Sequence, residues 1–282
     1  MRCSWTLDLT LSRTHAVGGA VVMDLSLTIV VVAVLTGYVA VLTGIGGGVL
    51  LVPALTYLFH IPIHTAVATS VTAIIATSLI GSYKFLQARL TNLEVGLTLE
   101  VLMAAGAFLG SLLSIHLGAG TLSLVFGLLL LVSGTSMVLD RKGQADQSKS
   151  RQDSTRDPIG DYEVSNMPVG IASSFVAGGL AGLLGIGGGV VQIPVMTLLM
   201  KLPVKEAVAT SNFMVGITAT SAVFVYFFEG YVNLILTGQV VLGVVIGGYL
   251  GAASVSRVNG GLIRRFLAVL LFSIGVLTLY RA

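Results

Sequence analysis

Charged residues are scarce in this sequence. Asp, Glu, Lys and Arg together make up 10% of its 282 residues, whereas 55% of the residues are hydrophobic. A soluble domain of this composition would expose very large apolar patches to water. The scarcity of charge therefore excludes an ordinary soluble protein and indicates a multi-pass membrane protein, with the lipid bilayer as a partner.

Cysteine and histidine are also rare, and the chemistry that they support is missing. Cys3 is the only cysteine, which excludes a disulfide framework within the chain, and the four histidines lack metal-ligand spacing. We therefore expect no metal and no cofactor. An HExxH motif, a P-loop and a nucleophile with a nearby base are absent as well, so enzyme chemistry and ATP-driven transport within this chain are not expected.

The formal net charge of +3 does not point to nucleic acid. The basic residues stand at the ends of apolar segments, where membrane topology places them, and they form no basic stripe. We therefore expect no nucleic-acid partner.

Apolar stretches long enough to cross a bilayer recur along the chain. A crossing helix needs about 20 residues. Segments near this length fall at 25–43, 65–84, 95–116, 121–139, 167–184, 207–228, 234–254 and 262–280. Two shorter apolar segments, 49–59 and 190–200, reach only about 16 Å as helices and are too short to cross alone. The sequence thus predicts an all-α polytopic membrane protein.

An internal duplication is the strongest pattern in the sequence. The segment GIGGG at residues 44–48 returns at residues 185–189, an offset of 141 residues. Pro53 and the Ala-Thr-Ser sequence at 68–70 return at the same offset, as Pro194 and residues 209–211. We therefore expect two repeats of about five transmembrane segments each. Their predicted bounds are 23–139 and 167–282.

The segments outside these repeats differ in composition. Residues 1–22 form a leader without a persuasive cleavage site, and Met23 opens a conventional membrane helix and is a candidate start. Residues 140–166 are rich in Lys, Arg, Asp, Gln and Ser. We expect this segment to be a solvated linker, and its basic residues place it in the cytoplasm.

Charges in equivalent loops predict the relative orientation of the repeats. Lys84 and Arg89 flank one loop of the first repeat, whereas the equivalent loop near Glu229 has no cation. One loop earlier the difference is reversed, because Lys201 replaces His60. An odd number of passes in each repeat puts equivalent loops on opposite sides of the membrane. The reversal therefore predicts inverted-topology repeats with both termini outside.

The two glycine segments are the predicted substrate site. Successive glycines are poor helix formers, so we expect each apolar helix to break there and to restart as a short helix. In inverted-repeat carriers such breaks meet near the midplane, and N–H groups at the start of a helix can hold an anion. The alternative is close helix packing, which is the expected role of the mid-helix glycines Gly106, Gly110, Gly247 and Gly251. The predicted substrate-binding glycines are Gly44, Gly46, Gly47, Gly48, Gly185, Gly187, Gly188 and Gly189.

Duplicated hydroxyl residues form the second part of the predicted site. Thr69 and Ser70, and in the second copy Thr210 and Ser211, lie about one turn inside a helix, with Asn212 beside them. Their side chains can donate hydrogen bonds to an anion held at the glycine breaks. The alternative is that they bond to their own helix or to a neighbouring helix.

Two further polar residues stand in apolar surroundings. Gln192 follows the second glycine segment where the first copy has Leu51, so it is a candidate for substrate selection or for a helix–helix hydrogen bond. Glu100 lies about 10 Å along its segment, and an ionisable group at that depth is a candidate for proton coupling. The alternative for Glu100 is a partnered carboxylate near the membrane surface.

These residues resemble the TauE/SafE family of sulfite exporters and sulfonate permeases. The resemblance rests on the GIGGG, Pro and Ala-Thr-Ser elements in both copies and extends from about Met23 to Tyr280. It implies a multi-pass protein of the cell inner membrane that moves a small anion such as sulfite, thiosulfate, sulfoacetate or a related organosulfonate.

The predicted function is a secondary transporter of such anions that works by alternating access around a pseudo-symmetric site at the midplane. A proton or a sodium ion is the candidate coupling ion, and a homodimer is the candidate assembly. Two alternatives stay open. One is a passive anion channel or facilitator, and the other is a membrane sensor or partner subunit that binds an anion without flux.

Overall fold

The computed structural model describes residues 26–139 and 166–254, together with six residues near the C-terminus. The regular structure of these residues is entirely helical. The leader predicted at 1–22 and all but the last residue of the predicted linker lie outside the described residues. So does most of the last predicted span.

The described part of the first half starts with the long helix Ser26–Thr43. A short helix α2 (Gly48–Pro53) follows and runs into the π-helical segment η1 (Ala54–Leu58). Three long helices complete this half: α3 (Ile63–Gln87), α4 (Leu93–His116) and α5 (Ala119–Leu139). Because α3 begins directly after Pro62, Thr69 and Ser70 lie about two turns inside it, and the predicted depth of one turn was wrong.

The second half repeats these elements. It contains α7 (Met167–Leu184), α8 (Gly189–Pro194), η2 (Val195–Leu199), α9 (Val204–Phe228) and α10 (Leu234–Ser254). The bounds of α7, α8, η2 and α9 are those of helix Ser26–Thr43, α2, η1 and α3 shifted by 141 residues. The duplication in the sequence thus has a counterpart in the helix boundaries.

Six of the described helices are long and apolar enough to cross a membrane. They are Ser26–Thr43, α3, α4, α7, the Glu206–Phe228 part of α9, and α10. Their outward faces carry exposed large hydrophobic side chains, such as Val101 on α4 and Ile235 on α10, which lipid can cover. The prediction of an all-helical, multi-pass membrane protein is confirmed.

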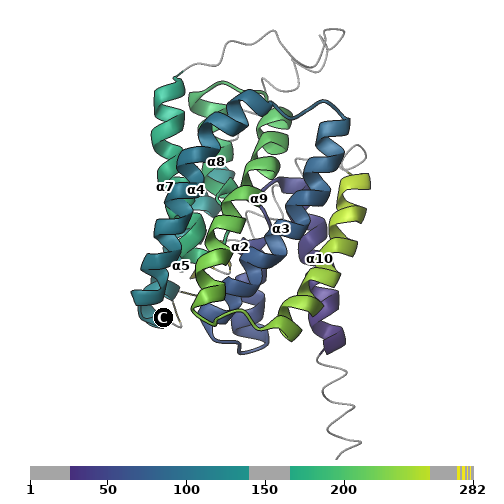
Figure 1. Cartoon of the computed structure of the whole chain (residues 1–282), viewed down its shortest axis with the longest axis vertical. Coiled ribbons are helices and arrows are strands. Elements are labelled where there is room, and N and C mark those ends of the chain that lie inside the picture. Colours follow the sequence, from purple (N-terminus) through teal and green to yellow (C-terminus); the bar gives the residue numbers. More distant parts are fainter. Residues whose placement is uncertain are drawn as a thin grey trace, which may run out of the picture.

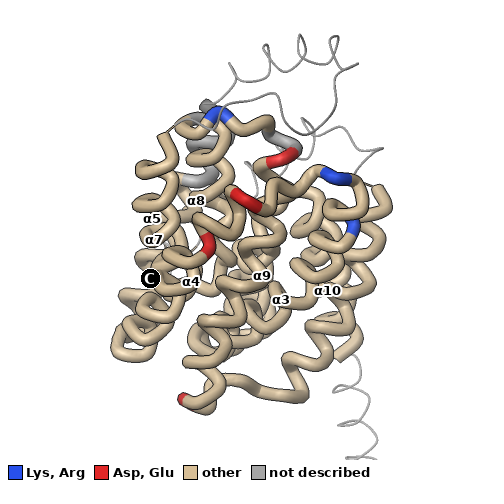
Figure 2. Tube along the Cα trace, turned by 45° about the horizontal axis from the view of Figure 1, so that its top comes forward, with Lys and Arg blue, Asp and Glu red and all other residues tan. Residues whose placement is uncertain are grey.

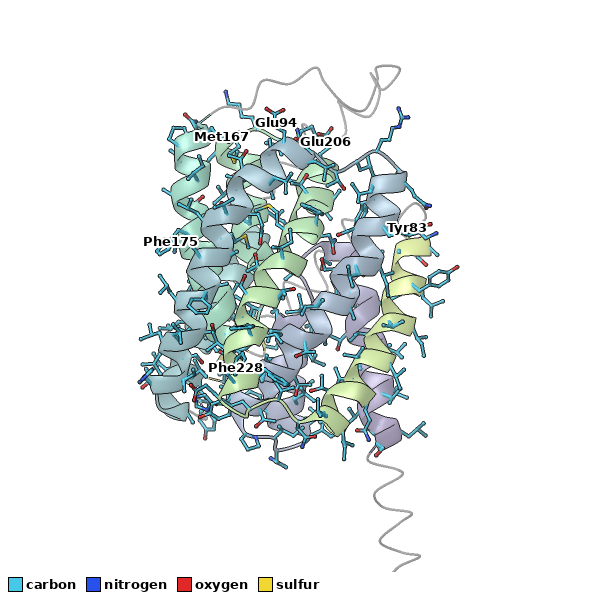
Figure 3. The ribbon with its side chains drawn as sticks, in the orientation of Figure 1. Tyr83, Glu94, Met167, Phe175, Glu206 and Phe228 are labelled. Atoms are coloured by element: carbon cyan, nitrogen blue, oxygen red, sulfur yellow. The ribbon has the colours of Figure 1, made fainter. Side chains whose placement is uncertain are left out.

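The helices α3 and α9 lie against each other inside the bundle (Figure 1). The helix α10 packs on α3, and α4 packs on both α7 and α9. Figure 3 shows Glu206, in the first turn of α9, and Phe228, its last residue, at opposite ends of the bundle. Tyr83, near the end of α3, lies toward the Glu206 end in the same view. The helices α3 and α9 therefore run in opposite directions.

The described basic residues gather toward one end of the bundle (Figure 2). Lys84 lies in the last turn of α3, Arg89 lies just beyond it, and Lys201 precedes α9. Helix α7 begins at this same end, where Figure 3 labels Met167.

Glycines allow the long helices to approach closely. A Cβ atom on Gly106 or Gly110 of α4 would overlap a backbone carbonyl of α7. A Cβ atom on Gly247 or Gly251 of α10 would overlap a carbonyl of helix Ser26–Thr43. The packing role predicted for these four glycines is confirmed.

Candidate functional site

Both glycine segments interrupt a helix as predicted. Helix Ser26–Thr43 ends and α2 starts within the first segment, and α7 ends and α8 starts within the second. Three glycines in each segment have a positive φ, between 69° and 92°, a region that side-chain-bearing residues rarely adopt. They are Gly44, Gly46, Gly47, Gly185, Gly187 and Gly188.

The two breaks lie against each other, and their contact is reciprocal. A Cβ atom on Gly48 would overlap the carbonyl oxygen of Gly185. A Cβ atom on Gly189 would come within 2.5 Å of the carbonyl oxygen of Gly44. All four residues are buried. The start of each short helix therefore rests on the backbone of the other break.

Both breaks also lie near the middle of the bundle. Val215, close to the midpoint of α9, borders both of them. A Cβ atom on Gly46 or on Gly187 would lie 2.9 Å from Val215 Cγ1. The structure thus brings together, at mid-depth, two segments that are far apart in the sequence.

Each break leaves backbone N–H groups without partners. Among the described residues, the amides of residues 45–49 have no hydrogen-bond acceptor, and neither do the amides of 186–188 and 190. The Gly189 amide donates to the carbonyl of Gly187, 2.9 Å away. The first N–H groups of a helix have no partner within it, and buried donors are costly unless water or a ligand accepts from them. Both short helices also direct the positive ends of their dipoles at the breaks.

The predicted serines line the breaks and bond across the two halves. Ser70 Oγ donates to the carbonyl oxygen of Gly185 at 2.8 Å. Ser211 Oγ donates to the carbonyl oxygen of Gly44 at 3.2 Å. In this conformation both hydroxyl protons serve helix contacts, and the free backbone amides are the donors available to an anion.

The other predicted polar side chains of α3 and α9 make no hydrogen bond to the breaks among the described residues. Thr210 Oγ1 accepts a 3.0 Å hydrogen bond from the amide of Asn92, which ties α9 to the start of α4. Asn212 Nδ2 lies 3.5 Å from the carbonyl of Val208 in its own helix. Thr69 Oγ1 is buried without a partner among the described residues.

Gln192 is fully buried on α8. Its Nε2 donates a 2.9 Å hydrogen bond to Ser174 Oγ on α7, and its Oε1 has no partner among the described residues. The positions equivalent to Gln192 and Ser174 hold Leu51 and Ala33, so this polar pair exists in the second half alone. Gln192 therefore makes a helix–helix hydrogen bond and keeps one acceptor free beside the second break.

Glu100 lies deep in the bundle. Only 3% of its surface is exposed, and its Oε1 accepts a 2.8 Å hydrogen bond from Thr218 Oγ1 on α9. The hydrogen bond from the Asn92 amide places the start of α4 at the level of Thr210 on α9. Thr218, the partner of Glu100, lies just past the midpoint of α9. Glu100 is thus near mid-depth, and its partner is a hydroxyl, not a charge.

Three residues that the sequence analysis did not single out make buried hydrogen bonds between helices. They are Ser174, Thr218 and Tyr226, whose hydroxyl donates at 2.8 Å to the carbonyl of Gly182. The sequence contained one signal for Ser174. The first repeat has Ala33 and Leu51 where the second has Ser174 and Gln192, so both apolar-to-polar differences between the repeats fall on residues that bond to each other. The partners of Thr218 and Tyr226 lie on other helices, and no sequence pattern pairs them.

A small, shallow hollow lies beside the first break. It is lined by Val39, Ala40, Thr43, Ile45, Gly47, Val49 and Leu50. In the part of the chain that the structure describes, no group of three or more His, Cys, Asp or Glu side chains is arranged to hold a metal ion.

The chain is similar to known proteins over nearly its whole length. Residues 29–278 match the family model described as "Sulfite exporter TauE/SafE". The "Probable membrane transporter protein YunE" of Bacillus subtilis strain 168 is 30% identical over 266 residues, which is 89% of this chain and 96% of that protein.

Two further organisms contain similar proteins. A "Probable membrane transporter protein" of Haemophilus influenzae is 28% identical over 264 residues, covering 87% of this chain and 92% of that protein. One from Methanocaldococcus jannaschii is 29% identical over 213 residues, covering 72% and 74%. No solved structure matches the chain.

Proposed function

The chain belongs to the TauE/SafE family of membrane transporters, and from this premise we propose that it is a secondary transporter of a small sulfur-containing anion. Sulfite, thiosulfate and organosulfonates such as sulfoacetate are the candidate substrates. The transport function follows from the family, and the sulfur oxyanion follows from the family description, which names sulfite export.

One structural observation carries the proposed binding site. Two helix starts whose amides at residues 45–49, 186–188 and 190 have no acceptor among the described residues meet at mid-depth. Oxyanions bind well at such sites, because several N–H donors and two helix dipoles converge on the negative charge. Among the described residues Lys and Arg occur only at helix ends, so the bound anion would meet no strong countercharge and could leave again.

We also propose that the two halves are inverted repeats that open the site alternately to either side. The opposite directions of α3 and α9 support this, as do the matched helix boundaries. The bonds from Ser70 to Gly185 and from Ser211 to Gly44 are equivalent under the 141-residue shift. A rearrangement that loosens one of these bonds therefore has a counterpart of similar energy on the other side. In this proposal the end rich in Lys and Arg faces the cytoplasm.

The deciding experiment is flux into liposomes that contain the purified protein. Radiolabelled sulfite, thiosulfate and sulfoacetate are compared with sulfate and succinate. Gly188→Val should abolish flux, because Gly188 has a φ of 69° and a Cβ there would overlap Met103 Cε. Gly230→Val is the matched control: Gly230 also has a positive φ, of 76°, but a Cβ there meets nothing within 4 Å.

The outcomes separate the candidates. Flux of a sulfur anion that survives Gly230→Val and disappears in correctly inserted Gly188→Val supports the site. Equal flux in both variants would refute it. Anion binding in detergent without any flux would favour a sensor or partner subunit.

A further inference from the structure

Glu100 is a buried carboxyl group that the proposed anion site does not use. It is 97% removed from solvent, and Thr218 Oγ1 donates to its Oε1 at 2.8 Å. Its second oxygen, Oε2, is buried and has no partner among the described residues. An ionisable group at membrane depth with a free oxygen is expensive to keep unless it has a role.

Two contacts connect this carboxyl group to the glycine breaks. Met103, one turn along α4 from Glu100, borders Gly188 so closely that a Cβ on Gly188 would overlap its Cε atom. Val215, one turn before Thr218 on α9, borders both breaks through Gly46 and Gly187. Both members of the Glu100–Thr218 pair therefore lie one helical turn from a side chain that touches the candidate anion site.

The pair is present on only one side of the pseudo-symmetric core. The position equivalent to Glu100 is Val241, and the position equivalent to Thr218 is Thr77. Thr77 Oγ1 bonds within its own helix, to the carbonyls of Ile74 at 3.0 Å and Ala73 at 3.4 Å. A threonine in this register thus satisfies itself locally where no carboxyl group faces it, and Thr218 instead turns to Glu100.

We propose that Glu100 is the proton-binding site of this protein, and that its protonation permits an anion to bind at the adjoining glycine breaks. The proposal rests on the proposed anion transport. A hydronium ion on one side transfers its proton to Oε2: one O–H bond of hydronium breaks and leaves water, an O–H bond forms at Oε2, and the carboxylate becomes a neutral acid. The acid keeps its Thr218 hydrogen bond, and after the rearrangement the proton passes from Oε2 to water on the other side.

Proton binding at Glu100 and anion binding at the glycine breaks are coupled electrostatically because the two sites are close together. A carboxylate one helical turn from a side chain that touches the breaks repels an anion in a medium of low dielectric constant, and a neutral carboxylic acid does not. Proton and anion therefore bind together and cross together, as a symport.

The surroundings of Glu100 favour a proton over a metal ion. Hard cations take about six or more oxygen ligands. Among the described residues, Thr218 Oγ1 is the one side-chain hydrogen-bond partner of Glu100, and its neighbours along α4, Leu99 and Met103, belong to a buried apolar cluster. A carboxyl group with one free oxygen and no further oxygen ligands matches the binding of a proton.

In the described parts of α4, α7 and α9, the other titratable residues lie well away from the level of Glu100. Helix α7 contains none. On α9, Tyr226 lies about two turns beyond Thr218, and Lys205 and Glu206 lie in its first turn. On α4 itself, Glu94 is in the first turn and His116 is in the last. Glu100 is thus the candidate for proton uptake at this depth.

The test compares two transport modes in proteoliposomes that contain the full-length protein. The probes are radiolabelled sulfite, thiosulfate and sulfoacetate. Exchange across vesicles without a gradient requires anion binding and rearrangement only. Accumulation driven by a pH gradient also requires the proton site, and a gradient of one pH unit supports about tenfold accumulation of a monovalent anion by one-to-one symport.

Glu100→Gln should keep exchange and lose the roughly tenfold accumulation. Thr218→Val should shift the pH dependence of accumulation. The matched controls are Glu94→Gln, on the same helix near its start, and Thr77→Val, at the position equivalent to Thr218. Both controls should behave as wild type.

Each contrary result would overturn one specific claim. Unchanged pH-driven accumulation in Glu100→Gln would overturn the proton site and leave anion transport intact. Loss of exchange in inserted Glu100→Gln would place Glu100 in anion binding instead. Accumulation that follows a sodium gradient and not a pH gradient would overturn the proton assignment. Absence of exchange in wild-type vesicles would overturn the transport proposal, and the proton site with it.

Discussion

The hydroxyl of Ser70 on α3 donates a 2.8 Å hydrogen bond to the carbonyl of Gly185, the residue that follows the end of α7. A shift of 141 residues converts this bond into the one from Ser211 to Gly44, which is 3.2 Å long. Each half of the chain therefore supplies the donor that stabilises the glycine break of the other half.

Replacing Ser70 with Ala should destabilise the protein. The Gly185 carbonyl is buried, and loss of its donor should lower the free energy of unfolding by about 1 kcal/mol. The measurement is unfolding of the purified protein in detergent. Ser173→Ala is the control, because Ser173 Oγ bonds to Gly170 in its own helix. Equal stability of Ser70→Ala and wild type would contradict the bond across the halves.

Two adjacent glycines on α7 should respond differently to alanine. A Cβ on Gly178 would overlap the carbonyl of Met103, so Gly178→Ala should force α4 and α7 apart and cost about 1–3 kcal/mol. A Cβ on Gly179 would meet only the carbonyl of Gly106, at 3.8 Å, and should be tolerated. Thermal melting in detergent measures both. If Gly179→Ala proved the more damaging variant, the packing of α4 on α7 would be wrong.

Gln192→Leu should impair anion binding more than folding. Ser174 Oγ also donates to the carbonyl of Gly170 at 2.8 Å, so it keeps a partner when Gln192 is lost. If the second N–H of Gln192 Nε2 donates to the anion, KM should rise about tenfold or more, the effect of losing one hydrogen bond to a charged group. Gln239→Leu is the control, because Gln239 bonds to Ser26 at 3.1 Å. An unchanged KM would leave Gln192 a purely structural residue.

Equivalent helix ends should face opposite sides of the membrane. Ala88 and Glu229 are the exposed C-caps of α3 and α9 and differ by 141 residues. With Cys3 replaced by Ser, Glu229→Cys in intact cells should react with an impermeant maleimide, and Ala88→Cys should react only after the membrane is opened. Labelling of both cysteines from outside would exclude inverted repeats.

Much of this architecture could be predicted because it depends on local chemistry. The thickness of the bilayer sets the length of a crossing helix, so apolar run lengths indicated the spans. Glycine is the residue that enters the positive-φ region freely, so the GIGGG segments indicated where Ser26–Thr43 and α7 end. The duplication then showed which elements are equivalent.

Two features could not be predicted from local chemistry. The sequence indicated that Ser70 and Ser211 were polar groups in a membrane, but not whether a ligand or a backbone carbonyl accepts their protons. It placed Glu100 about 10 Å along its own helix but not near the middle of the bundle. That depth follows from the bond between the Asn92 amide and Thr210, which sets where α4 begins beside α9.

The sequence by itself determined the helical class, six of the eight predicted spans, the duplication and the glycine breaks, because backbone propensity and bilayer thickness act over a few residues at a time. Only the tertiary structure decided which break meets which serine and which hydroxyl reaches Glu100. Those partners lie 115 to 167 residues apart along the chain, and only the packing of whole helices brings them together.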